Sequence, residues 1–182
     1  LLGWLITRSI TRPVGEAVQI AEKIAAGDFT MQIDTSARDE VGQVLTALDK
    51  AVHAVKTMSS EAAGLAQAAV QGKLATRADA SKYQGEYKNI VSGVNATLDA
   101  VIGPLNVAAN YVDRISKGDI PPKITDSYNG DFNTIKNNLN ACIDAVNALV
   151  GDANTLSKAA VDGHLATRAD ATRHQGDFRK IV

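Results

Sequence analysis

Apolar residues recur at alternating intervals of four and three residues along most of this chain. The clearest series spans residues 87–115 and consists of Tyr87, Val91, Val94, Leu98, Val101, Leu105, Ala108, Val112 and Ile115. Similar series occupy residues 41–69 and 132–160, and a shorter one occupies residues 10–24. Sustained spacing of this kind is typical of helices that pack along a narrow seam as a left-handed coiled coil. The chain is therefore predicted to be all-α and built from long helices.

Four connectors interrupt this helical pattern. Each begins at a glycine and ends at an acidic residue that opens the next apolar series, in the pairs Gly27 and Glu40, Gly72 and Glu86, Gly118 and Asp131, and Gly163 and Asp177. The connector spacing alternates between 13 and 14 residues, whereas the interval from an acidic residue to the next glycine is always 32 residues. One extra residue rotates the rest of an α-helix by about 100°, but a loop tolerates it. The constant interval indicates that the phase of each helix matters.

The chain also contains an internal repeat. Residues 72–91 and 163–182 are 91 positions apart and identical at 12 of 20 positions, and Pro13 and Pro104 are separated by the same 91 positions. With two connectors in each 91-residue step, the repeating element is about 45 residues long. This predicts four tandem repeats that bury their apolar faces together. Their predicted bounds are 7–56, 57–102, 103–148 and 149–182, the fourth being incomplete.

Pro104 lies inside one of the predicted helices. A proline in a helix interior removes a backbone hydrogen bond and usually bends the helix. One interpretation is a continuous helix with a kink or restart at a repeat boundary. The other is that one helix ends there and the next begins with the proline in its first turn.

Composition narrows the classes of partner. The chain has 19 basic and 20 acidic residues and a net charge of −1, which argues against a nucleic acid or another polyanion as partner. Aromatic residues make up only 4% of the chain, which suits narrow helical seams better than a thick globular core. Cys142 is the single cysteine, so no intrachain disulfide is possible and a reducing cytoplasmic setting is favoured.

The chain opens with an apolar run at residues 1–6. Six residues cannot cross a bilayer, which requires roughly 20 apolar residues. We expect this run to be the end of a membrane-spanning helix, with Trp4 near the interface and Arg8 and Arg12 on the cytoplasmic side. The alternative is the start of an ordinary buried helix.

A repeat of this size has too little apolar surface to fold alone. Two parallel helices joined by an extended connector, doubled in a homodimer, would form a parallel four-helix bundle. A connector of about 13 residues reaches back along such a helix at up to about 3.3 Å per residue.

Three motifs together resemble the HAMP domain: TRP at 11–13 before an amphipathic helix, GDF at 27–29 at the start of a connector, and DEVG at 39–42 at the start of the second helix. The resemblance implies two apolar connector anchors and a role for Glu40 as hydrogen-bonding partner of the start of the first helix. The second and fourth repeats diverge, because Ala78 and Ala169 replace the second anchor and the proline is absent. The residues expected to pack the repeats and relay a signal are Pro13, Gly27, Phe29, Ile33, Glu40, Pro104, Gly118, Ile120, Ile124 and Asp131.

Runs such as GDIPPKITDSYNGDFNTIKNNLN are similar to those of tandem HAMP arrays in bacterial chemotaxis transducers and hybrid histidine kinases. The resemblance implies a homodimeric relay that carries a conformational change from a transmembrane helix to a cytoplasmic output module at the inner membrane. A chemotaxis transducer is the first expectation, and a sensor or hybrid histidine kinase the second. A static coiled-coil spacer is the rival from another class. Nothing in the sequence predicts an enzyme, a cofactor or a metal site.

Two features of the repeated segment invite a ligand-binding interpretation. His164 and His174 lie in one connector, but the sister connector has Lys73 and Tyr83 there, so we expect solvated side chains rather than metal ligands. The motif LATRAD occurs twice, at 74–79 and 165–170, and we expect surface ion pairs or a contact between connector and helix.

Overall fold

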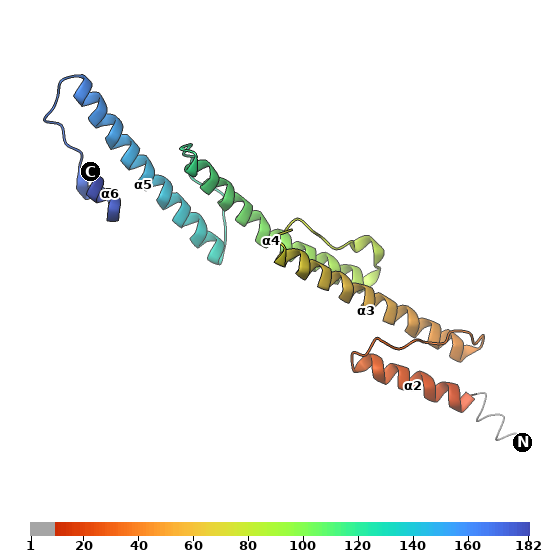
Figure 1. The fold of residues 1–182 in the computed structure, drawn as a ribbon. Helices are drawn as coiled ribbons and strands as arrows, with labels where there is room; N and C mark the ends of the chain where they lie inside the picture. The colour runs from red at the N-terminus through yellow and green to blue at the C-terminus, as the bar shows by residue number, and fades with distance from the viewer. Residues whose placement is uncertain (1–9) are drawn as a thin grey trace, which may run out of the picture. The chain divides into compact units, whose positions relative to one another are not determined.

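The computed structural model describes residues 10–182, and all of its regular structure in that range is helical. In Figure 1 the longer helices are α2 (Arg12–Ala25), α3 (Glu40–Val70), α4 (Gly85–Ser116) and α5 (Gly130–Val161), followed by the short α6 (Gly176–Ile181). Two short 3-10 helices, η2 (Ala80–Lys82) and η3 (Ala171–Arg173), lie in the connectors that follow α3 and α5. The all-α prediction is confirmed. The apolar run at residues 1–6, with Trp4, and Arg8 lie outside the described residues.

The three long helices have nearly the same length. α3 contains 31 residues, and α4 and α5 contain 32 each, in agreement with the constant interval in the sequence. α4 continues through Pro104, so the interpretation in which a helix ends there is wrong. Pro13 lies in the first turn of α2, a position where proline is well tolerated. The two prolines therefore occupy different structural positions.

Each connector starts at a glycine in the left-handed conformation, with φ between 73° and 79° at Gly27, Gly72, Gly118 and Gly163. At the end of α2 the Gly27 N–H donates to the Ile24 carbonyl, and the Asp28 N–H donates to the Lys23 carbonyl. This pair of bonds is a Schellman motif, which ends a helix and reverses the chain. An L side chain is strained at such a φ, which explains the glycine at the start of every connector.

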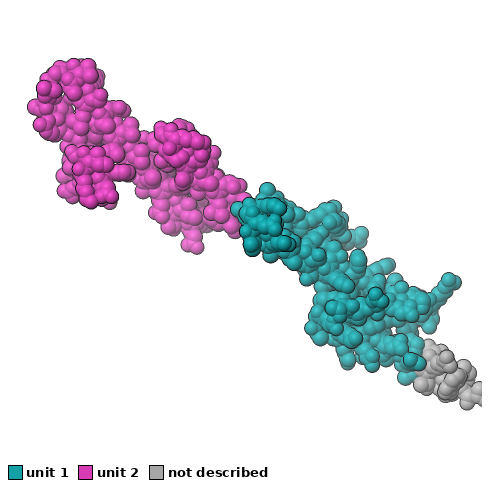
Figure 2. Space-filling view, in the orientation of Figure 1, with its two compact units in different colours: residues 1–98 teal, residues 99–182 magenta. Residues whose placement is uncertain are grey.

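The chain divides into two compact parts, residues 1–98 and 99–182 (Figure 2). Few side chains are buried in either part. Leu45, Val52, Tyr83 and Val91 are buried in the first part, and Ile102, Ile124 and Ile143 in the second.

Several seam positions of the 4-3 series stay exposed in the single chain. Val94, Val101 and Leu105 on α4 each retain 42% of their accessible surface, and Val150 on α5 retains 47%. Regularly placed apolar surface of this kind marks an interaction face. A second chain along these faces stays a prediction, as does the homodimer.

Candidate functional site

The second connector, residues 73–84, is held to α4 by one asparagine. Asn95 Nδ2 donates to the Ala78 carbonyl at 2.8 Å, and Asn95 Oδ1 accepts from the Ala78 N–H at 3.0 Å. One side-chain amide thus pairs with both backbone groups of a single connector residue, as a neighbouring β-strand would. We call this arrangement the amide clamp.

The third connector, residues 119–129, has the same clamp. Asn140 Oδ1 accepts from the Ile124 N–H at 2.8 Å, and Asn140 Nδ2 donates to the Ile124 carbonyl at 3.0 Å. The two clamp residues, Asn95 and Asn140, each lie nine positions after the acidic residue that opens their helix. Sequence reasoning missed this pair, although an asparagine at the same distance after the second and the third connector was a usable signal.

Apolar side chains complete the docking of the third connector. Ile124 is 6% exposed, Pro121 is fully buried and Ile120 is half-buried. Pro104 on α4 and Ile124 line a residual cavity of only about 10 Å³. The predicted anchor Ile124 therefore lies in a closely filled interior.

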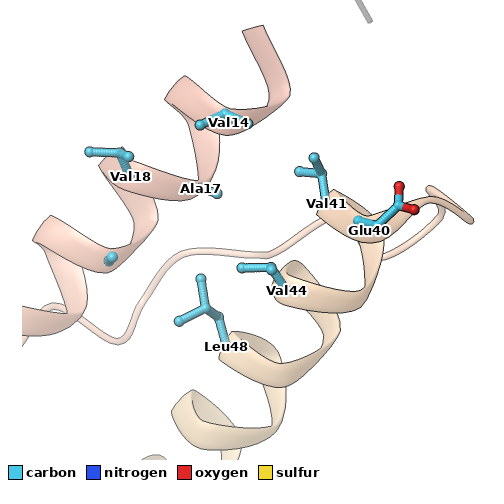
Figure 3. Close-up of a pocket in the computed structure, with 8 residues that line it drawn as sticks. Val14, Ala17, Val18, Glu40, Val41, Val44 and Leu48 are labelled. Carbon is cyan, nitrogen blue, oxygen red and sulfur yellow. The ribbon is translucent and has the colours of Figure 1, made fainter. Parts of the chain in front are cut away.

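The first repeat is more open. An apolar groove of about 420 Å³ lies between α2 and α3 and is lined by Val14, Ala17, Val18 and Ala21 from α2 and by Glu40, Val41, Val44 and Leu48 from α3. Figure 3 shows how the labelled side chains of the two helices face each other across it. The two predicted anchors of the first connector, Phe29 and Ile33, are only half-buried. No hydrogen bond joins Glu40 to α2 within residues 10–182, and a bond between Glu40 and the start of the first helix stays a prediction.

The first connector, residues 28–39, is fixed at its end by a helix cap. Asp39 accepts a hydrogen bond from the Gly42 N–H at 2.9 Å, which makes Asp39 the N-cap of α3. Gly42 is buried, and a Cβ at this position would collide with the Ala37 carbonyl. The DEVG motif thus forms the junction between the first connector and α3, and Glu40 is the first residue of this helix. Asp131, the equivalent of Glu40 in the third repeat, lies in the first turn of α5.

A different contact joins the second connector to α3. The Lys82 ammonium lies 2.9 Å from Glu61 Oε1, and the adjacent Tyr83 is only 5% exposed. Burial, and then the Glu61 carboxylate, raise the pKa of the Tyr83 phenol. The Tyr83 hydroxyl and Glu61 Oε2 are buried without a hydrogen-bond partner among the described residues. The hydrogen bond between connector and helix is therefore the one that Lys82 Nζ donates to Glu61 Oε1.

The fourth connector, residues 164–175, repeats this contact with other residues. His174 Nε2 lies 2.6 Å from Asp152 Oδ2, and Arg173 Nη1 lies 3.5 Å from Asp152 Oδ1. His174 is 4% exposed, so the expectation that it is solvated is wrong: the carboxylate on α5 lets the ring be buried with a hydrogen bond. We call this helix carboxylate, together with the basic and ring-bearing residues of the connector, the polar latch. Corresponding residues of the two latches are 91 positions apart: Glu61 and Asp152, Lys82 and Arg173, and Tyr83 and His174.

The repeated LATRAD motif shapes the connector itself. Arg168 Nη1 donates to the carbonyls of Leu165 and Thr167, while Asp170 accepts from the N–H and hydroxyl of Thr172. An ion pair between Arg168 and Asp170 is therefore absent from the described structure, whereas the other expected contact, between connector and helix, is present in the first copy of the motif, at Ala78 and Asn95. The Thr172 hydroxyl, followed by its N–H, holds the pKa of Asp170 below the ordinary value.

No group of three metal-ligating side chains comes together within residues 10–182. The contacts that hold the connectors to the helices are amide clamps, apolar anchors and polar latches.

Two regions of the chain match family models described as HAMP domains, at residues 5–57 and 82–148. The chain is 31% identical over 58 residues to the methyl-accepting chemotaxis protein McpQ of Pseudomonas putida, a match that covers 32% of this chain and 9% of that protein. It is 29% identical over 55 residues to a putative sensory transducer protein of Acetivibrio thermocellus, covering 30% of this chain and 10% of that protein. The match thus spans about a tenth of the length of each relative. No solved structure gives a significant match.

Proposed function

We propose that this chain, which contains two HAMP domains in tandem, relays a conformational signal within a membrane receptor. The observation that carries the proposal is the continuity of α3 and α4. Each helix runs for 31 or 32 residues without a break, from the second helix of one predicted repeat into the first helix of the next. A rotation or tilt imposed at one end of such a helix reaches the other end, because the backbone hydrogen bonds fix the phase.

The docked connectors suit this role. A relay needs two packings that differ by a few kcal/mol, so that a small input shifts the population between them. Clamps and latches are individually modest contacts, since a hydrogen bond contributes about 0.5–1.5 kcal/mol net. The alanine-rich seam at Ala62, Ala66 and Ala69 adds little burial, which keeps the gap between packings small.

We assign the output to a chemotaxis transducer, because both relatives carry transducer or chemotaxis names. The alternative output is a sensor or hybrid histidine kinase. The input would come from a transmembrane helix that ends at residues 1–6, and the chain would then lie on the cytoplasmic side of the inner membrane. Of the described helices, α4 alone is long and apolar enough to cross a bilayer. Its match to a HAMP model and its clamp at Asn95 favour a place in the relay instead.

A change of helical phase tests the proposal in the full-length receptor. Deleting Ala109 from α4 rotates the rest of the helix by about 100° and should abolish or invert the control of kinase output. The matched control inserts one glycine after Ser127 in the third connector, where a loop absorbs the change, and should preserve most of the response. Both receptors are compared at equal abundance in the membrane. Equal effects of the two changes would contradict a phase-dependent relay.

Crosslinking tests the predicted homodimer. In a Cys142→Ser background, Leu48→Cys and Val94→Cys should each form disulfides between chains in membranes, because both residues belong to the 4-3 seams. Lys50→Cys, on an exposed position of α3, is the control and should crosslink far less. Failure of both seam cysteines would argue against parallel packing of two copies.

Substitutions in the first connector distinguish a signal relay from a static spacer. Replacing Phe29 and Ile33 by serine should shift the signalling output of a relay without changing receptor abundance. The same change would leave the output beyond a passive stalk unaltered.

A further inference from the structure

The first repeat differs from the next two at the clamp position. Asn95 and Asn140 lie nine positions after Glu86 and Asp131, and the residue nine positions after Glu40 is Asp49. Asp49 is exposed on α3 and makes no hydrogen bond to the first connector in the described structure. One of the three equivalent helices therefore lacks the amide that pairs with its connector.

Chemistry explains why aspartate does not replace the amide. The clamp requires one acceptor for the connector N–H and one donor for the carbonyl of the same residue. An ionised carboxylate only accepts, so Asp49 has no donor for the Ile33 carbonyl. Its negative charge also faces the negative end of that carbonyl dipole if the connector approaches.

The surroundings of Ile33 agree with a loosely held connector. Ile33, Asp49 and Val52 line an open hollow of about 370 Å³. The clamped equivalent, Ile124, is 6% exposed and borders a cavity of only about 10 Å³. Ile33 itself is half-buried.

We propose that the first connector is the releasable one, and that Asp49 keeps it so by withholding the amide clamp that fastens the second and third connectors. The first repeat then exchanges between docked and undocked connector states, while its neighbours stay docked. Asp49 acts as a positioning residue: it decides how firmly Ile33 is held to α3. This inference concerns connector docking alone and stands independently of the signalling role.

Amide hydrogen exchange in the 182-residue chain tests the proposal residue by residue. In the wild-type chain the Ile33 N–H should exchange about tenfold or more faster than the Ile124 N–H, because only the latter is clamped. Asp49→Asn should slow exchange at Ile33 about tenfold, the effect of gaining one clamp. Asp49→Ala removes the charge without adding a donor and should leave Ile33 fast.

The reciprocal substitution is the matched control. Asn140→Asp should release Ile124 and speed its exchange about tenfold, with Ile33 unchanged. The proposal is overturned if Ile33 is already as protected as Ile124 in the wild-type chain. It is equally overturned if Asp49→Asn leaves exchange at Ile33 unchanged, or if Asp49→Ala protects Ile33 as well as Asp49→Asn does.

Discussion

The third and fourth connectors, both within residues 99–182, dock by different chemistry. The third buries Pro121 and Ile124, and Ile124 lines a cavity of only about 10 Å³. The fourth has Ala169 in place of the isoleucine and instead buries His174 against the Asp152 carboxylate at 2.6 Å. An apolar anchor therefore holds the third connector to its helix, and a polar latch holds the fourth. In the fourth connector the pair His174 and Asp152 provides a buried contact where the isoleucine is missing.

The comparison also explains the alternating connector lengths. The longer second and fourth connectors contain the 3-10 turns η2 and η3, each started by an aspartate that accepts from the residue two positions on. This turn lies directly before the ring-bearing residue, Tyr83 or His174. The extra residue thus accompanies a turn that delivers the ring of the polar latch to the helix.

The largest effect is expected from removing the apolar anchor. Ile124→Ala should lower the free energy of unfolding by about 3 kcal/mol, because it deletes buried methyl groups in a site that cannot collapse easily. Ile33→Ala, at the half-buried equivalent in the first connector, should cost about 1 kcal/mol or less by the same reasoning. Urea denaturation of the two variants measures the difference. Equal losses would mean that the two connectors are packed alike.

A smaller effect is expected from breaking the polar latch. Asp152→Ala leaves the buried His174 ring without its partner and should cost about 2 kcal/mol. Asp144→Ala is the matched control on the same helix: its ion pair with Lys123 has both side chains more than half exposed and should contribute less than about 1 kcal/mol. The pair is compared by urea denaturation and by hydrogen exchange at His174. If Asp152→Ala lowers the free energy of unfolding no more than Asp144→Ala does, the contact between Asp152 and His174 does not hold the fourth connector to α5.

The smallest effect concerns pH and the turn before the latch. The hydrogen bonds from Thr172 lower the pKa of Asp170, so they add stability above the pKa of an unfolded aspartate, near 4, and this is lost as the pH falls through the lower folded value. The Thr172 amide resonance should therefore titrate below pH 4. Thr172→Val removes the hydroxyl bond, the largest cause, and should move the titration upward. An unchanged midpoint would show that this bond does not set the pKa.

Much of the fold was predictable because helical phase leaves a trace in the sequence. The 4-3 series located α3, α4 and α5, and the constant interval gave their lengths to within a residue. The course of the chain at Pro104 was not predictable, because the same proline fits a first turn or a helix interior. Pro13 and Pro104 occupy equivalent sequence positions, yet Pro13 lies in the first turn of α2 and Pro104 lies inside α4.

The docking contacts were harder to predict than the helices. The anchor Ile124 was recognisable as an apolar residue at a matched position in a polar connector. Asn95 and Asn140 lie outside the 4-3 apolar series, and their role depends on a backbone segment 16 or 17 residues away. The burial of His174 depends on Asp152, 22 residues away on α5, and a histidine in a connector is indistinguishable from a solvated one without that partner.

The sequence separation within each polar latch has a consequence for exchanging parts between receptors. Glu61 belongs with Lys82 and Tyr83, and Asp152 belongs with Arg173 and His174, so each latch is inherited as a block of about twenty residues. A hybrid joined between residues 152 and 174 would combine a carboxylate of one parent with a ring of the other. Joints placed before Glu61 or before Asp152 keep each latch whole, and we expect repeats exchanged at these positions to retain their docked connectors.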